Sequence, residues 1–177
     1  AHEITERLDA DGQIVTPLDL GSARAALEQA YDSGVRGVAI AFVHGYLNPD
    51  HEIAVAELAR DIGFTQVSAS HQVSRLAKLV GRGDTTVVDA YLSPILRGYV
   101  DQVRDALDIG RACKALMFMQ SNGGLTDAAL FQGKDAILSG PAGGIVGMVK
   151  TGQAAGYDRL IGFDMGGTST DVSRFGG

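Results

Sequence analysis

The segment that most restricts how this chain can fold covers residues 159–175, R-L-I-G-F-D-M-G-G-T-S-T-D-V-S-R-F. An apolar run from Leu160 to Phe163 leads into Asp164, and a pair of glycines follows shortly after it. The apolar run predicts a buried strand. Adjacent glycines let the backbone turn sharply with its N–H groups facing outward. The segment therefore predicts a β-hairpin that can hold phosphate, with an ordinary tight turn as the alternative interpretation.

The polar residues of this hairpin are of the kind that phosphate binding requires. Asp164, at the end of the predicted strand, can hold a hydrated Mg²⁺, because this ion keeps most of its waters and needs only one or two carboxylates. Glycine N–H groups and threonine hydroxyls can then bond the phosphate oxygens, and Asp171 is expected to steady the hairpin or the metal shell. The predicted phosphate-binding residues are Asp164, Gly166, Gly167, Thr168, Ser169, Thr170 and Asp171.

Two further glycine-rich segments leave binding and purely structural interpretations open. Residues 138–149, L-S-G-P-A-G-G-I-V-G-M-V, predict a helix that opens at Pro141 and either packs closely on another backbone or binds an anion at its N-terminus. Residues 119–125, M-Q-S-N-G-G-L, predict a strand that ends in a left-handed turn or in a ligand site. The secondary candidates for the binding cleft are Ser121, Asn122, Gly123, Gly124, Ser139, Gly140, Gly143 and Gly144.

The first half of the chain predicts an α/β unit. The continuous apolar run at 35–43 is typical of a strand buried on both faces. A helix is expected at 51–62 and another strand at 64–70, and this succession implies a parallel pair with a helical crossover. Before these elements, the turn residues 9–12 predict a hairpin and residues 23–32 predict a helix.

The basic, glycine-containing segment 72–84 shows no periodicity, so we place a domain boundary there and divide the chain into residues 1–82 and 83–177. Beyond it, Pro94 is expected to kink a long helix or to mark its start. The elements expected in this half are a helix at 87–107 capped by Thr85 or Thr86, strands at 115–120, 137–138 and 159–164, and helices at 126–131 and 142–155.

Composition argues against several classes of partner. With a formal net charge of −6 and a pI near 5.1, the chain is not expected to bind nucleic acid or an anionic membrane. No apolar run is long enough to span a membrane. The one cysteine, Cys113, excludes an internal disulfide and fits a reducing cytoplasm. His44 and His51 could be metal ligands, although His51 at a helix start fits helix capping as well.

The order of the segments resembles a known arrangement. A small-residue helix followed by a strand and a D-x-G-G-T hairpin resembles the interdomain helix and second phosphate motif of the actin–sugar kinase–Hsp70 superfamily. More narrowly, five motifs between residue 46 and the C-terminus are similar, in sequence and in order, to those of the hydantoinase A/5-oxoprolinase family. They are Y-L-N-P-D-H-E, T-T-V-V-D-A-Y-L-S-P, M-Q-S-N-G-G-L, S-G-P-A-G-G-I-V-G and F-D-M-G-G-T-S-T-D-V.

This resemblance implies an α/β fold of the ribonuclease-H-like, actin/Hsp70 type. Residues 1–82 are then the C-terminal part of the family's N-terminal domain, and residues 83–177 the start of its hydantoinase A domain. The resemblance also implies ATP and Mg²⁺ as cofactors. The expected activity is ATP-dependent hydrolysis of a cyclic amide, such as hydantoin, N-methylhydantoin or 5-oxoproline, together with a partner subunit or domain.

Two departures from the family pattern limit what the chain is expected to do alone. It lacks the family's N-terminal D-x-G-G-T-F-T-D hairpin, and it ends before the nucleoside-binding half. We therefore expect a fragment without ATPase activity of its own. The alternatives to a cyclic amide hydrolase are an acetone-carboxylase-like subunit and a nucleotide-responsive binding or assembly module of the Hsp70–actin type.

Overall fold

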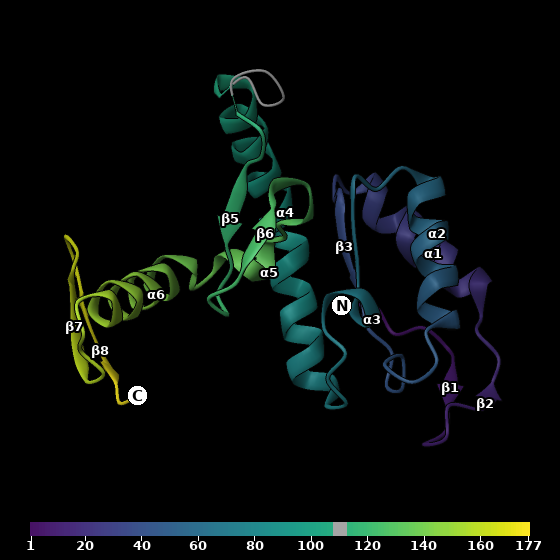
Figure 1. Cartoon of the computed structure of the whole chain (residues 1–177). Helices are drawn as coiled ribbons and strands as arrows, with labels where there is room; N and C mark the ends of the chain where they lie inside the picture. Colours follow the sequence, from purple (N-terminus) through teal and green to yellow (C-terminus); the bar gives the residue numbers. More distant parts are fainter. Residues whose placement is uncertain (108–112) are drawn as a thin grey trace. The chain divides into compact units, whose positions relative to one another are not determined.

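The computed structural model describes residues 1–107 and 113–177 (Figure 1). They divide into two compact units, residues 1–96 and residues 97–177. Each unit combines helices with short strands, which confirms the α/β class. The domain boundary between residues 82 and 83 stays a prediction. None of the helices in the described residues is both long and apolar enough to cross a membrane.

Unit 1 begins with the predicted hairpin. Strands β1 (Arg7–Leu8) and β2 (Ile14–Thr16) pair antiparallel. In the turn, the carboxylate of Asp9 accepts hydrogen bonds from the backbone N–H groups of Asp11 at 2.9 Å and Gln13 at 2.8 Å. An aspartate that bonds its own turn in this way closes the hairpin where the sequence places it.

The parallel strand–helix–strand arrangement is also confirmed. Strand β3 (Gly37–Ile40) pairs in parallel with β4 (Gln66–Ala69), and α2 (Asp50–Ile62) makes the crossover. Strand β3 starts later than predicted, because the N–H of Val35 bonds the carbonyl of Ala30 at the end of the preceding helix, at 3.1 Å. That residue therefore finishes the helix instead of entering the sheet.

The core of unit 1 lies between the parallel strands and two helices (Figure 1). Helix α1 (Leu20–Asp32) is capped by Asp19, whose carboxylate accepts a hydrogen bond from the N–H of Ser22 at 3.0 Å. Its apolar side chains and those of α2 meet the strands. The buried residues of this core are Ala23, Leu27, Ile40, Val55, Ala56, Leu58, Ala59, Phe64 and Ala69.

The segment after β4 differs from the prediction of an aperiodic linker. It contains the short helix α3 (Ser70–Val73) and the start of the long helix α4 (Leu79–Ala106), which begins well before the predicted residue 87. Thr85 and Thr86 therefore lie inside α4 and cap nothing. The hydroxyl of each donates a hydrogen bond of 2.7 Å to the carbonyl four residues earlier.

Pro94 lies within α4 and does not mark its start. Proline has no N–H, so the carbonyl of Ala90, four residues earlier, loses its usual helical donor. That carbonyl oxygen is 3.4 Å from the place where a Cβ would stand on Gly37 of β3. The absence of a side chain at Gly37 thus lets the backbone of α4 approach the strand.

Unit 2 holds two antiparallel hairpins with a helix between them in the sequence. Strand β5 (Met117–Met119) pairs with β6 (Leu125–Asp127), and β7 (Leu160–Met165) pairs with β8 (Thr170–Phe175). Helix α6 (Ser139–Ala154) connects the two hairpins and contacts β7 and β8.

The helix predicted at residues 126–131 is wrong. These residues form the end of β6 and a single 3₁₀ turn, η1 (Ala128–Leu130). The carboxylate of Asp127 caps this turn by accepting a hydrogen bond from the N–H of Ala129 at 2.9 Å. The next residue along, Phe131, stacks on the ring of Phe118 in β5 at a centroid distance of 4.9 Å. This contact packs the 3₁₀ turn against the β5–β6 hairpin.

The strand predicted at residues 137–138 is wrong as well. The two residues join the short helix α5 (Gly133–Ala136) to α6. The N–H of Leu138 is held by the hydroxyl of Ser121 at 2.9 Å, so a side chain takes the place of a strand partner.

Candidate functional site

The predicted phosphate hairpin is formed by β7 and β8, which pair up to Met165 and Thr170. At its tip, the N–H of Gly166 donates to the carbonyl of Ser169 at 2.9 Å, which leaves two residues between them as the loop. The hairpin itself is therefore confirmed. Its role in phosphate binding stays a prediction.

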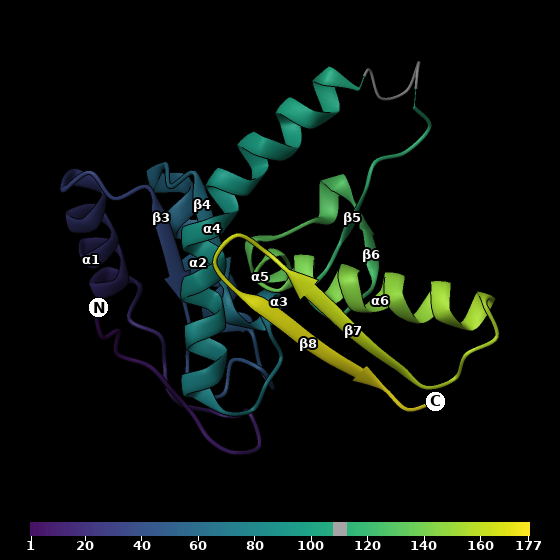
Figure 2. The same ribbon diagram turned by 90° about the vertical axis from the view of Figure 1, so that its left-hand side faces the viewer.

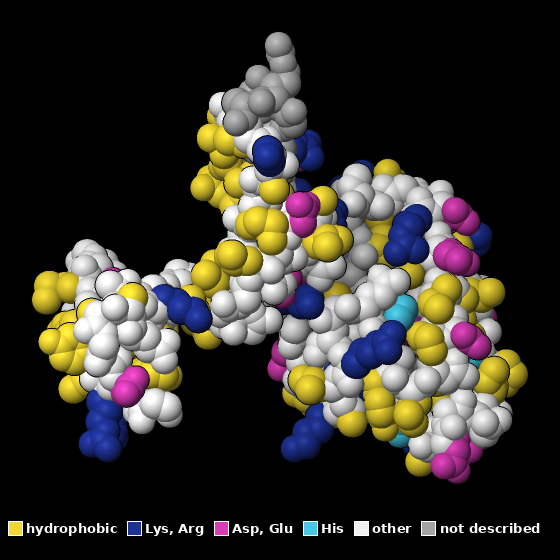
Figure 3. Space-filling model, in the orientation of Figure 1, with side chains coloured by type: hydrophobic (Ala, Val, Ile, Leu, Met, Phe, Trp, Pro, Cys, Tyr) yellow, Lys and Arg dark blue, Asp and Glu magenta, His cyan; other side chains and the backbone are white. Residues whose placement is uncertain are grey.

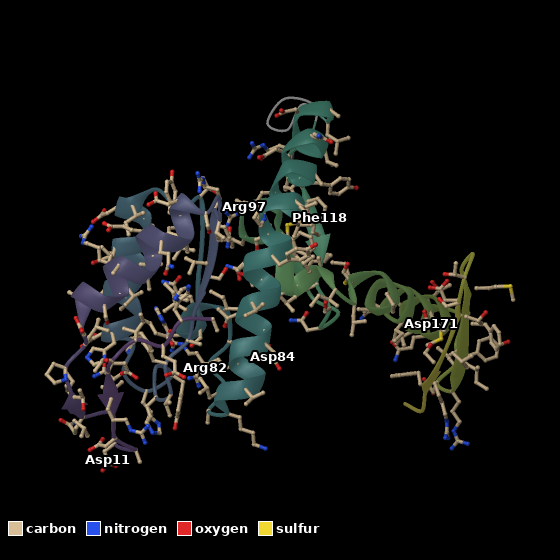
Figure 4. All side chains as sticks on the ribbon, turned by 180° about the vertical axis from the view of Figure 1, so that it is seen from behind. Asp11, Arg82, Asp84, Arg97, Phe118 and Asp171 are labelled. Carbon is tan, nitrogen blue, oxygen red and sulfur yellow. The ribbon has the colours of Figure 1, made fainter. Side chains whose placement is uncertain are left out.

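Asp164 and Asp171 stand directly opposite each other in the two strands. Side chains at opposite positions of an antiparallel pair project from the same face. That face is turned toward α6, because the Oδ2 atom of Asp164 lies 3.4 Å from the place where a Cβ would stand on Gly144. Figure 4 shows Asp171 on the hairpin beside the helix. Glycine at position 144 leaves room for the carboxylate.

A groove of about 640 Å³ lies along α6 and the hairpin, which run side by side in Figure 2, and both carboxylates line it. Its remaining lining is mostly apolar and carries no basic side chain among the described residues, so the groove favours a cation. The lining residues are Pro141, Gly144, Ile145, Met148, Ile161, Gly162, Phe163, Asp164, Asp171, Val172 and Ser173.

Two glycines of α6, Gly144 and Gly152, face the β7–β8 hairpin. Gly144 makes room for Asp164, and the side chain of Leu160 fills the place that a Cβ on Gly152 would need. Pro141 is the third helical residue, not the first as predicted, and Leu138 precedes the helix without a side-chain cap. Close packing is thus the interpretation of this helix that the structure supports, whereas anion binding at its N-terminus stays a prediction.

The turn at residues 121–124 lies beside the start of α6. The hydroxyl of Ser121 holds the residue just before the helix, and a Cβ on Gly143 would stand 3.6 Å from the side chain of Met119. Gly123 has a φ of 83°, so the left-handed turn that the sequence allowed is present.

The polar groups of these secondary candidates are largely used within the chain. The side-chain oxygen of Asn122 accepts the N–H of Gly124 at 2.8 Å, and the hydroxyl of Ser139 donates to the carbonyl of Ala136 at 3.0 Å. Gly140 has no atom within 4 Å of its Cβ position. The structure therefore gathers these residues near α6 without aiming their side chains at a common point.

The backbone of the glycines at the hairpin tip is not left-handed. Neither Gly166 nor Gly167 has a positive φ, so left-handed backbone is not the reason for glycine there. A Cβ on Gly167 would meet no atom within 4 Å. What glycine provides at position 167 is open space on an exposed loop.

The outer face of the hairpin differs from the predicted buried strand. Because side chains alternate along a strand, those of Ile161, Phe163, Met165 and Val172 lie on the face opposite Asp164 and Asp171, and they are mostly exposed, although three of these residues also border the groove. Figure 3 shows hydrophobic side chains on the surface of this hairpin. A two-stranded ribbon has two faces, and α6 covers only one of them within the described residues.

The histidines do not form the metal site that composition left open. Within the described ranges, no three His, Cys, Asp or Glu side chains come close enough to hold a metal ion. His51 pairs through Nδ1 with Glu6 at 2.9 Å, and Nδ1 of His44 is buried without a hydrogen-bond partner. Cys113 is a free, half-buried thiol. A Mg²⁺ held by Asp164 through water needs no such cluster and stays a prediction.

A buried cluster around Glu52 in unit 1 was not predicted from the sequence. Glu52 is fully buried in α2, and its Oε1 accepts the N–H of Phe42 at 2.9 Å and the hydroxyl of Ser70 at 2.5 Å. Its Oε2 accepts two hydrogen bonds from His71, from the backbone N–H at 2.9 Å and from Nδ1 at 2.7 Å. The sequence contained a signal for this burial, because position 52 lies on the same face of the predicted helix as the apolar Val55, which is buried.

Arg82 completes this cluster from α4, where Figure 4 labels it. The guanidinium is fully buried, and its Nε donates to the hydroxyl of Ser70 at 2.8 Å. Its other nitrogens donate to the carbonyls of Phe42, Val43, Leu76 and Ala77. Ser70 therefore bridges a buried cation and a buried anion. These bonds hold together residues that are far apart in the sequence.

Comparison with known proteins places both halves of the chain in related families. Residues 82–177 match the family model described as hydantoinase/oxoprolinase. Residues 1–63 match the model described as the hydantoinase/oxoprolinase N-terminal region.

Named relatives cover nearly the whole chain. A 5-oxoprolinase of Saccharomyces cerevisiae is 45% identical over 169 residues, which are 93% of this chain and 13% of the yeast protein. The caprolactamase subunit alpha of Pseudomonas jessenii is 34% identical over 170 residues, 94% of this chain and 24% of that subunit. This chain thus spans only a small part of the length of these relatives.

Two solved structures have the same fold over 97% of the chain and 25% of their own chains. The ATP-dependent caprolactamase from Pseudomonas jessenii superposes with a TM-score of 0.84 at 34% identity. A nucleotide-free acetone carboxylase superposes with a TM-score of 0.86 at 28% identity.

Proposed function

Because the chain belongs to the hydantoinase/oxoprolinase family, we propose that it is part of an ATP-dependent hydrolase that opens a cyclic amide. The observation that carries this proposal is the pair Asp164 and Asp171, which stand opposite each other and line one groove with α6. Relatives named 5-oxoprolinase and ATP-dependent caprolactamase support cyclic amides as the substrate class.

The groove provides suitable ligands for a metal–phosphate group. Carboxylate and hydroxyl oxygens are hard donors of the kind that Mg²⁺ prefers, so the residues present fit this ion. When bound there, Mg²⁺ offsets the negative charge of the phosphate oxygens. Asp164 orients the hydrated ion, Asp171 supports it, and the hairpin tip from Gly166 to Thr170 donates hydrogen bonds to phosphate. The turn at residues 121–124 and the start of α6 form the secondary wall.

The proposed chemistry solves a problem of reactivity. An amide carbonyl is a poor electrophile, and phosphorylation of its oxygen by ATP turns that oxygen into part of a good leaving group. In this step the amide oxygen attacks the γ-phosphorus and ADP leaves. Water then adds to the activated carbon, and the ring C–N bond breaks as its nitrogen takes a proton. A second water cleaves the resulting acyl phosphate into a carboxylate and inorganic phosphate. The 177 residues supply one phosphate hairpin, so we propose that other parts of the protein and a partner subunit complete the site. The name of the caprolactamase relative, a subunit alpha, supports a partner.

The finer features of the fold and setting belong to the same proposal. The succession of α6 and the β7–β8 hairpin supports a ribonuclease-H-like arrangement of the actin/Hsp70 type. We assign residues 1–82 to the N-terminal region of the family and residues 83–177 to its hydantoinase A domain, a division that the matched residues 1–63 and 82–177 support. The reducing cytoplasm suits a chain with one free cysteine.

Acetone carboxylation is the second candidate function, and the fold similarity to an acetone carboxylase favours it. Cyclic amide hydrolysis is preferred, because the 5-oxoprolinase relative is 45% identical and the carboxylase only 28%.

The test measures ADP release by the full-length protein with Mg²⁺-ATP in the presence of 5-oxoproline, caprolactam or hydantoin, or of acetone with bicarbonate. The proposed function requires ADP release that depends on one of the cyclic amides and matches the amount of ring-opened product. Dependence on acetone would select the carboxylase. ADP release at the same rate with and without each of these compounds would contradict both candidate functions and favour a nucleotide-driven assembly module.

A further inference from the structure

The cluster around Glu52 lies where ligands bind in parallel sheets. Strand β4 ends at Ala69, and Ser70 and His71 follow it directly; the loop after β3 contributes the backbone of Phe42. Both strands are parallel, so these residues share the carboxyl edge of the sheet. In open α/β sheets this edge is the usual location of ligand sites.

The hydrogen bonds of Glu52 determine the tautomer of the His71 imidazole. Each carboxylate oxygen accepts two hydrogen bonds, from donors between 2.5 and 2.9 Å away. An ionised carboxylate only accepts hydrogen bonds, and four donors saturate it. Nδ1 of His71 must therefore carry the hydrogen that it directs to Oε2 of Glu52.

The hydrogen on Nδ1 bears on what the other imidazole nitrogen can do. Glu52, the partner of Nδ1, and Arg82 are both fully buried and are joined through Ser70. Arg75 also lies near His71, and its Nε donates to the backbone carbonyl of His71. A neutral imidazole that donates through Nδ1 has a lone pair on Nε2.

The described residues make no hydrogen bond to Nε2 of His71. Within the described part of the chain, the hydrogen bonds of the His71 ring all go through Nδ1. The side chain of His71 retains 9% of its surface exposure, whereas that of Glu52 has none. A carboxylate that orients an imidazole while leaving Nε2 available is the arrangement that enzymes use to prepare a proton acceptor.

We propose that Nε2 of His71 is the hydrogen-bond acceptor for the ring N–H of the cyclic amide. This inference rests on the proposed function and adds a substrate contact to it. A secondary amide that leaves water must find an acceptor for its N–H, because an unpaired polar group is costly. An oriented, neutral imidazole at the carboxyl edge of β4 meets this need, and it rejects a ring whose nitrogen carries a methyl group.

Chemical protection of the histidine tests the contact directly. Diethyl pyrocarbonate acylates unprotonated imidazole nitrogens, and mass spectrometry of the peptide that contains His71 reports the extent. In the full-length protein, we expect 5-oxoproline or caprolactam, whichever drives ADP release, to slow the labelling of His71 about tenfold at saturation. Its N-methyl derivative should not slow it. His51, whose Nδ1 bonds Glu6 in a similar pair, is the internal control and should label equally in all samples.

A pair of kinetic variants separates recognition from structural support. In His71→Asn, the side-chain amide can take the place of Nδ1 and keep donating to Glu52, while the acceptor at Nε2 is lost. We expect KM for the cyclic amide to rise about tenfold with little change in kcat, since the bond contributes equally to the ground and transition states. His51→Asn removes the equivalent atom of the control pair and should leave KM unchanged.

The outcomes distinguish this inference from the proposed function. Cyclic-amide-dependent ADP release without protection of His71, with equal protection by the N-methyl compound, or with an unchanged KM in His71→Asn overturns the inference and leaves the function standing. If no cyclic amide drives ADP release, the function fails and the inference fails with it.

Discussion

The replacement Glu52→Gln tests whether the buried cluster holds unit 1 together. In glutamine, an NH2 group replaces one of the two carboxylate oxygens of Glu52. This NH2 group then faces two hydrogen-bond donors, which are either the two of His71 or those of Phe42 and Ser70. Two buried donors lose their acceptor, and Arg82 loses its compensating charge. Leaving buried donors unpaired costs about 1–3 kcal/mol each, so two of them cost about 2–6 kcal/mol. We expect a loss of about 4 kcal/mol in the local stability of unit 1.

Hydrogen–deuterium exchange in the full-length protein measures this loss where it occurs. The backbone N–H of His71 is itself bonded to Glu52, so a peptide that spans residues 66–76 reports the opening of the cluster. A loss of about 4 kcal/mol corresponds to exchange about a thousandfold faster, because about 1.4 kcal/mol is a factor of ten.

The matched control is Glu57→Gln, which removes the same charge from an exposed position of the same helix. It should change exchange by no more than about twofold, as surface substitutions usually do. Exchange in Glu52→Gln within threefold of the wild-type rate would refute the reasoning. The four hydrogen bonds would then contribute nothing that a neutral amide cannot replace.

Three further predictions concern the hairpin, α4 and the end of α2. Asp164→Asn should lower the turnover of the full-length protein about a hundredfold and its nucleotide affinity less, because the carboxylate acts on charge that develops in the transition state. Wild-type turnover in this variant would show that the hairpin has only a structural role. Gly167→Val should instead weaken nucleotide binding about tenfold or more without lowering the melting temperature, since no atom of the chain lies within 4 Å of the new Cβ. Gly98→Ala should stabilise α4 by about 0.5–1 kcal/mol, because this helical glycine faces open space. Gly63→Ala should destabilise the protein, because Gly63 has a φ of 114° and its Cβ would meet the hydroxyl of Tyr31 at 3.0 Å. Calorimetry of the two variants checks the sign of each change.

Local signals explain the elements that were predicted correctly. The turn at Asp9 closes through its own side chain, Asp19 caps α1, and the glycine pair after Asp164 ends a strand in a tight hairpin. Each of these features involves residues only a few positions apart, so sequence alone contains the interaction. The parallel pairing of β3 with β4 follows in the same way, because a helix of this length between two strands leaves few other connections.

The wrong predictions share a different cause. The lack of an amphipathic pattern around Arg82 and its glycine neighbours predicts an aperiodic linker at residues 72–84, yet α4 already begins at Leu79. The bonds that hold this part of the helix reach from Arg82 to Phe42 and Val43, about forty positions away in the sequence. Likewise, stacking of Phe131 on Phe118 accompanies a 3₁₀ turn in the place of the predicted helix.

The family, the α/β class and the hairpin with its two aspartates could all be assigned from the sequence alone. Those features depend on composition, short-range turn chemistry and motif order. The packing of Asp164 against Gly144 and the opposite positions of Asp164 and Asp171 become visible only in the folded chain, as does the single buried cluster of Glu52, His71 and Arg82. A charged side chain in a sequence is expected at the surface, and burying it is tolerable only when donors and counter-charges converge from several elements. That convergence is a property of the folded chain.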